Sequence, residues 1–154
     1  RQVNRQRIED LLSLPDAEQK RLIAKARSKA LEYRAQRPLE YDQLQSGLSA
    51  TIDPPAEDWL LRSYGFDRFN FWAYIHTDDS AQAIEKSITA DYEGAHPLYV
   101  NADSNWLNME SEALLKLFYG DIPARTRPLV GAETLVSNET AEQLIGYAPD
   151  YRME

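Results

Sequence analysis

The periodicity of the apolar residues changes at Gly65, and this change constrains the fold of the 154-residue chain more than any other feature. Before Gly65 the sequence is rich in strong helix formers, and apolar residues at helical spacing predict helices over 4–13 and 17–36. After it, short aromatic or alternating segments at 69–76 and 97–101 predict strands. The sequence therefore predicts a mixed α/β fold of short elements that follows a helical N-terminal extension.

Two of the expected helices carry an apolar face that should be covered by the rest of the protein. On the helix over 17–36 this face consists of Leu22, Ile23, Ala26, Ala30 and Tyr33. On a helix over 80–89 it consists of Ala81, Ile84 and Ile88. Further helices are expected over 57–64, which Gly65 should end, over 108–119, and from Ser137 to Gly146.

Charge also divides the chain, but at residue 37 and not at Gly65. Residues 1–37 hold ten Lys/Arg and five Asp/Glu, whereas 38–154 hold seven and twenty. We interpret 1–37 as a basic helical extension, 38–64 as a linker with a short helix, and 65–154 as the main domain. The basic segment could be an arm for nucleic acid or a membrane surface, but it lacks interleaved aromatic residues. We favour a helix lying on its own acidic domain or on an acidic partner, with no nucleic-acid or membrane partner.

Several kinds of site and segment are excluded by residues or patterns that the sequence lacks. The chain has no cysteine, which excludes disulfides, thiolate zinc sites and cysteine nucleophiles, and which fits a cytoplasmic compartment. It also has no apolar run of 18 or more residues, so no transmembrane helix is expected. The two histidines, His76 and His96, are isolated and do not have the spacing of metal ligands.

Four segments occur in an order that matches a known family. They are 71–84 with its Tyr-Ile-His-Thr-Asp-Asp run, Val100-Asn101-Ala102, 114–123, and 137–149 with its Leu-Ile-Gly-Tyr-Ala-Pro exit. Over residues 66–152 the chain thus resembles the C-terminal, substrate-side lobe of the extended short-chain dehydrogenase/reductase family, the NAD(P)-dependent epimerases and dehydratases. Thr140 and Tyr147 depart from the Lys and Trp that are usual there.

The resemblance implies a substrate-binding role without the machinery for hydride transfer. The family's Gly-x-x-Gly-x-x-Gly turn, which brings the backbone close to a pyrophosphate, is absent, and no tyrosine has a lysine four residues on. The resemblance implies NAD or NADP for a full-length protein, a small-molecule substrate, and a Rossmann half or a second copy as partner; no cofactor is expected in this chain. Two alternatives stay open: a non-catalytic binding or interaction domain, and a cofactor-free acid/base enzyme with a repurposed pocket.

Tyr74 and His76 are candidate substrate-binding residues at the end of the predicted aromatic strand. Strand alternation would place them on one face with Asn70 and Trp72, and would place Phe71, Ala73 and Ile75 on the other. Tyr74 could line a pocket or enter the core. His76 could lie near a substrate or could be a hydrogen-bonded residue at the start of a helix.

Arg125 and Arg127 are the second candidate pair. Two arginines on one side of an extended segment could hold a phosphate, a carboxylate or a nucleotide-sugar group. They could equally form surface salt bridges with nearby acids. Asp78 and Asp79 could be read as paired acid/base groups, but a pair at the start of a helix more often caps the helix and compensates its dipole.

Overall fold

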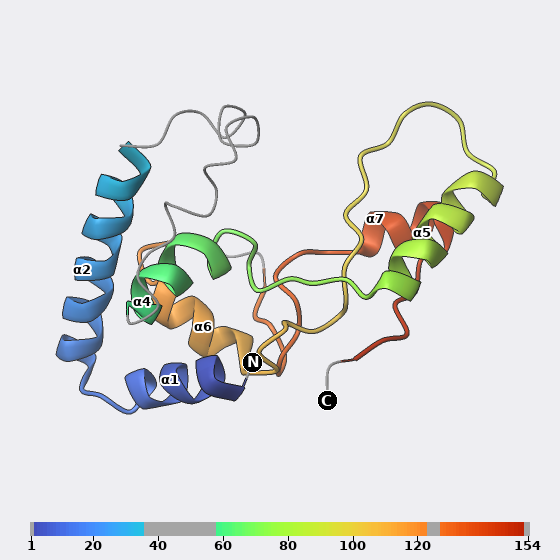
Figure 1. Ribbon diagram of the computed structural model, residues 1–154. Helices are drawn as coiled ribbons and strands as arrows, with labels where there is room; N and C mark the ends of the chain where they lie inside the picture. The colour runs from blue at the N-terminus through green and yellow to red at the C-terminus, as the bar shows by residue number, and fades with distance from the viewer. Residues whose placement is uncertain (1, 36–57, 123–126, 153–154) are drawn as a thin grey trace.

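The protein is built from helices joined by extended segments and turns (Figure 1). The computed structural model describes residues 2–35, 58–122 and 127–152. In these ranges the elements are α1 (Gln2–Leu12), α2 (Asp16–Ala35), α4 (Trp59–Arg62), the π-helix η2 (Ser63–Asp67), α5 (Thr77–Thr89), α6 (Ser111–Phe118) and α7 (Glu139–Ile145). None of the described residues forms a β-strand, and a single isolated antiparallel bridge joins Ser104 to Glu133. The prediction of an α/β fold is therefore wrong.

The strand predicted over 69–76 is interrupted by two consecutive residues in the left-handed backbone region. Phe71 has φ 57° and Trp72 has φ 53°, values that a strand does not contain. Trp72 is fully buried, its ring lies 5.1 Å from that of Phe118, and its amide donates to the carbonyl of Asp67 at 3.1 Å. The chain therefore turns at the buried indole of Trp72, where the alternating sequence pattern predicted that the strand would continue.

The segment 97–101 is extended but has no ladder to join. Its neighbour is the segment around Tyr74, where the backbone amide of Ala102 donates to the carbonyl of Tyr74 at 2.7 Å. A sheet requires a repeated series of such bonds between two strands. The left-handed turn at Phe71 leaves too short a partner for that series.

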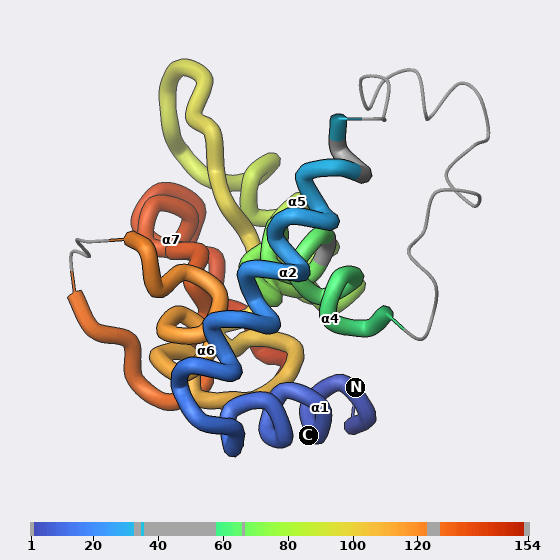
Figure 2. Tube along the Cα trace, turned by 90° about the vertical axis from the view of Figure 1, so that its left-hand side faces the viewer, coloured from blue at the N-terminus to red at the C-terminus, as the bar shows by residue number. Residues whose placement is uncertain are grey.

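The N-terminal helices share one hydrophobic core with α6. This core, which we call the large core, combines Ile8, Leu11 and Ala26 with buried residues of later segments: Tyr64, Trp72, Leu107, Met109, Leu114, Leu117 and Phe118. Leu22, Ile23 and Ala30 pack against it, which confirms the apolar face predicted for α2; the side chain of Tyr33 lies outside the described ones. Figure 2 shows α2 passing over α4 and α6, with which it is in contact.

Acidic residues of the same chain form ion pairs with basic side chains of α2. The guanidinium of Arg27 lies 3.1 Å from the carboxylate of Asp121, and the ammonium of Lys29 lies 2.8 Å from that of Asp58. The Lys29 hydrogen bond also lowers the pKa of Asp58.

Predicted linker residues 38–57 lie outside the described ranges. The predicted stop at Gly65 is wrong, because η2 continues through it to Asp67.

A second, smaller core joins α5 and α7. It contains Ala83, Ala141, Ile145 and Tyr147, with Leu98 and Val100 packed against it. The apolar face predicted for this helix is the wrong one, since Ile84 is 63% exposed and Ile88 79% exposed. The opposite face packs because it carries Ala83, which allows close approach to α7, and Lys86, which donates to the carbonyl of Gly146.

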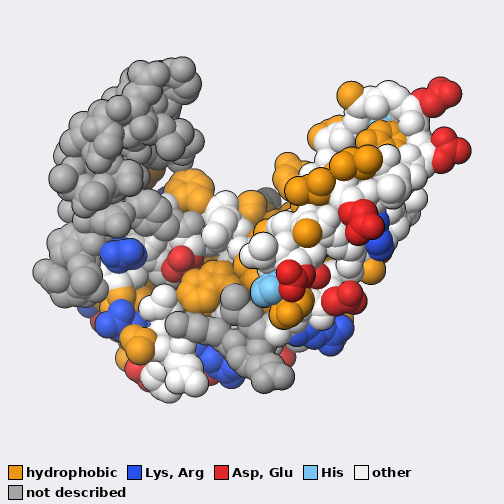
Figure 3. Space-filling model, turned by 45° about the vertical axis from the view of Figure 1, so that its right-hand side comes forward, with side chains coloured by type: hydrophobic (Ala, Val, Ile, Leu, Met, Phe, Trp, Pro, Cys, Tyr) orange, Lys and Arg blue, Asp and Glu red, His pale blue; other side chains and the backbone are white. Residues whose placement is uncertain are grey.

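Some of the exposed apolar residues, among them Ile84 and Ile88, lie on the lobe that α5 and α7 form, where Figure 3 shows hydrophobic side chains at the surface. No helix in the described part of the chain is both long enough and apolar enough to cross a membrane.

Candidate functional site

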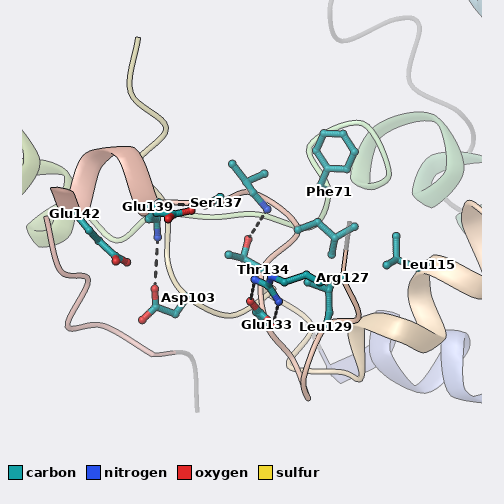
Figure 4. A pocket seen from close by; sticks show the side chains of 13 residues that line it. Phe71, Asp103, Leu115, Arg127, Leu129, Glu133, Thr134, Ser137, Glu139 and Glu142 are labelled. Carbon is teal, nitrogen blue, oxygen red and sulfur yellow. Dashed lines mark hydrogen bonds and ion pairs between the residues drawn. The ribbon is translucent and has the colours of Figure 1, made fainter. Parts of the chain in front are cut away.

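A cleft of about 670 Å³ lies beside α6 and α7 and is lined by both of them and by the loops that precede α7 (Figure 4). Leu115 lines it from α6, and Phe71 and Asp103 line it from earlier parts of the chain. The remaining lining residues are Arg127, Leu129, Glu133, Thr134, Leu135, Val136, Ser137, Asn138, Glu139 and Glu142. Residues far apart in sequence therefore build one concave surface.

Two buried asparagines fix one side of the cleft. The side-chain amide of Asn138 donates to the carbonyl of Asn101 at 2.7 Å, and the amide N–H of Asn101 donates back to the Oδ1 of Asn138 at 3.1 Å. Asn138 also reaches Oδ1 of Asp103 at 3.4 Å. Because each buried polar group has a partner, this reciprocal pair holds the start of α7 against the segment at 101–103.

A second polar network fixes the loop around Ala132, which lies on the other side of the cleft. The Nδ2 group of Asn105, which is fully buried, donates to the carbonyls of Met109 and Ala132 and to the hydroxyl of Ser111 at 2.8–3.1 Å. Ser111 in turn donates to the carbonyl of Glu133 at 2.5 Å. The loop around Ala132 is thereby attached to the first turn of α6.

Arg127 lies in the cleft, but its guanidinium is already engaged. Both of its terminal nitrogens donate to the carboxylate of Glu133, one of them at 3.0 Å to Oε2. This fork geometry raises the pKa of Arg127 and lowers that of Glu133 through the shared hydrogen bonds. The pair matches the salt-bridge reading of the sequence. Arg125 lies outside the described residues.

Tyr74 and His76 do not line the cleft, so the structure does not bring them together with Arg127. His76 is the N-cap of α5: its Nδ1 accepts the amide N–H of Asp78 at 3.2 Å. Its ring stacks on Tyr151 with centroids 3.5 Å apart and an interplanar angle of 6°. Tyr74 is half-buried, and its carbonyl holds Ala102.

Asp79 has a structural position. Its carboxylate, 2% exposed, accepts the backbone N–H groups of Asp150 at 3.0 Å and of Tyr151 at 3.4 Å. It therefore ties the C-terminal segment to the start of α5. Asp78 is exposed, with a carboxylate oxygen 3.6 Å from Nδ1 of His76. The two neighbouring acids thus serve different local purposes.

Tyr147 is buried and donates its hydroxyl to the carbonyl of Asn101 at 3.2 Å. Burial, together with the nearby negative charges of Asp79 and Asp103, raises its pKa to about 12. A phenol with that pKa stays protonated at neutral pH, so it acts here as a fixed hydrogen-bond donor to the same segment that Asn138 holds.

Sequence reasoning missed the residues at the two ends of the cleft: Phe71, Asp103, Glu139 and Glu142. Glu139 and Glu142 are three residues apart at the start of α7, a spacing that puts both on one helix face and that could have been recognised. Phe71 and Asp103 reach the cleft through contacts distant in sequence, for which the chain gives no local signal.

In the part of the chain that the structure describes, no group of three or more His, Asp or Glu side chains could hold a metal ion. Comparison of the chain with protein-family models, with curated proteins and with solved structures gives no match.

Proposed function

We propose that this chain is the substrate-binding portion of a protein similar to NAD(P)-dependent oxidoreductases, epimerases or dehydratases, and that its cleft receives the small-molecule substrate. The observation that carries the proposal is the cleft itself, whose volume of about 670 Å³ lies within the common range of roughly 300–1,000 Å³ for ligand pockets. Two segments on which the family resemblance rests supply Asn101 and Asn138, which hold one side of that cleft.

The cofactor of such a protein does not suit this cleft. A pyrophosphate needs free positive charge or a turn of exposed backbone N–H groups. Among the lining residues, which all belong to the part of the chain that the structure describes, only Arg127 is basic. Its guanidinium is paired with Glu133. Binding of NAD or NADP therefore stays an expectation for a protein that includes a Rossmann half, and no step of hydride transfer is assigned to this chain. The cytoplasmic compartment likewise stays a prediction from the absence of cysteine.

The proposal is tested by NMR titration of the ¹⁵N-labelled chain with three probes: UDP-glucose, 4-nitrophenyl β-D-glucoside and 4-nitrophenyl β-D-glucuronide. We expect at least one of them to shift the amide signals of residues 133–139 while those of α1 stay in place. Ser137→Trp should abolish these shifts because Ser137 lines the cleft and an indole there would fill it. Thr140→Trp is the matched control, since Thr140 is exposed on α7 and does not line the cleft. If no probe perturbs residues 133–139, the proposal fails.

A second candidate function is protein interaction through a second copy of the chain. The exposed pair Ile84 and Ile88 favours it, because contiguous exposed apolar side chains are typical of interaction surfaces. Light scattering should then give a dimer mass for the wild-type chain and a monomer mass for the double variant Ile84→Glu/Ile88→Glu. A monomeric wild-type chain at high concentration would exclude this candidate.

A further inference from the structure

The cleft has two chemically different ends (Figure 4). Phe71, Leu115 and Leu129 lie at one end, where aromatic and aliphatic carbon forms the wall. Asp103, Glu139 and Glu142 lie at the other, together with Ser137. A ligand that fills the cleft must therefore combine an apolar part with a part rich in hydrogen-bond donors.

Phe71 is presented to the cleft in a fixed orientation. Its ring is 40% exposed and stacks on Tyr119, with centroids 5.9 Å apart and an interplanar angle of 22°. Tyr119 is itself held by Arg68, whose guanidinium carbon lies 4.2 Å from the ring centroid. The buried indole of Trp72 anchors the chain directly after the ring. A flat ligand ring that packs here meets a preorganised partner, which lowers the entropic cost of binding.

The charges at the other end select against anions. Both terminal nitrogens of Arg127 donate to Glu133, so the charge of the guanidinium is already balanced by a carboxylate of the protein. Carboxylates accept hydrogen bonds and cannot donate them, so Asp103, Glu139 and Glu142 suit ligand hydroxyl groups. A phosphate or carboxylate in the same place would meet like charge and find no free cation among the lining residues that the structure describes.

From these observations, and resting on the proposed function of the cleft, we infer that its ligand is an uncharged, hydroxyl-rich molecule that carries a flat ring, such as a neutral aryl glycoside. The ring packs on Phe71, and the hydroxyl groups donate to the carboxylates at the start of α7. Nucleotide-sugars and other anionic conjugates are disfavoured, in contrast to the anion-binding role considered for Arg127 from the sequence.

The test compares two probes that differ in one group. 4-Nitrophenyl β-D-glucoside and 4-nitrophenyl β-D-glucuronide share the ring and the sugar, but the second carries a carboxylate in place of a hydroxymethyl group. We expect the glucoside to bind at least about threefold more tightly by NMR titration, and we expect the double variant Glu139→Gln/Glu142→Gln to remove most of the difference by removing the like charge. A glucuronide or UDP-glucose that binds as tightly as the glucoside to the wild-type chain would overturn the inference while leaving the proposed function intact.

The ring contact has its own test. Phe71→Leu keeps an apolar side chain but removes the flat face, and we expect it to weaken glucoside binding about threefold or more. Phe69→Leu is the matched control, because Phe69 is exposed nearby and does not line the cleft. Should Phe71→Leu not fold, nuclear Overhauser contacts between the nitrophenyl protons and the Phe71 ring of the wild-type chain decide the same point. Equal effects of the two variants, or absence of those contacts, would refute the placement of the ring; absence of binding by every probe would refute the proposed function and the inference together.

Discussion

Asp78 and Asp79 are adjacent acids whose replacement by alanine should have very different costs. Asp79 is 2% exposed and accepts two backbone N–H groups, from Asp150 at 3.0 Å and from Tyr151 at 3.4 Å. A hydrogen bond to a charged group contributes about 1.5–3 kcal/mol, and the longer of these two is near the limit of a useful bond. Water can reach the freed N–H groups, because Asp150 and Tyr151 are exposed. We therefore expect Asp79→Ala to lower the free energy of unfolding by about 2 kcal/mol.

Asp78→Ala is the matched control. The Asp78 side chain is 68% exposed, and its position in the first turn of α5 gives it a favourable interaction with the helix dipole of about 0.5 kcal/mol. Urea denaturation followed by circular dichroism measures both variants, and a loss of 2 kcal/mol in a chain of this size corresponds to a fall in Tm of roughly 4–8 °C. Costs that agree within about 0.5 kcal/mol would refute the assignment of the anchoring role to Asp79.

Three further predictions concern the core, the cleft and alkaline pH. Leu114→Ala, in the fully buried face of α6, should destabilise the protein by about 3 kcal/mol in urea denaturation, whereas the cleft-facing and half-buried Leu115→Ala should cost well under half of that. Glu133→Gln should free the guanidinium of Arg127 and tighten binding of the glucuronide in the NMR titration; unchanged affinity would show that the ion pair does not control access of anions. Burial raises the folded pKa of Tyr147 to about 12 from an ordinary value of 10. The contribution of Tyr147 to the free energy of unfolding is therefore complete below pH 10 and is lost as pH rises toward 12. Tyr147→Phe should flatten the profile of stability against pH in this range, and a profile that keeps its slope would contradict the shift.

The features that sequence could predict are those determined within one helix. The long run of helix formers over 17–36 predicted α2, and the covered face with Leu22 and Ala26 followed from 3.6-residue spacing alone. In α5 the same reasoning chose the wrong face, because periodicity identifies an apolar stripe but not which neighbour covers it. Ile84 forms the more apolar stripe, yet α7 packs on the side of the smaller Ala83.

The features that sequence could not predict depend on contacts distant along the chain. The strand predicted through Trp72 fails because this indole packs on Phe118, a residue that local alternation does not take into account. The cleft has the same origin: Phe71 enters it through that turn, and Asp103 enters it through the polar pairing at Asn138. Arg127 was found from its residue type, but its pairing with Glu133 decides its chemistry.

The division of the hydrophobic residues into two cores also divides the molecule spectroscopically. Trp72 lies in the large core, and Trp59 and Trp106 pack against it, which accounts for all three tryptophans of the chain. The small core between α5 and α7 contains the phenol of Tyr147 and no indole. Tryptophan fluorescence will therefore follow the unfolding of the large core and will not report directly on the lobe that α5 and α7 form. Any separation between a tryptophan curve and a circular dichroism curve would then measure how strongly the two cores cooperate in unfolding.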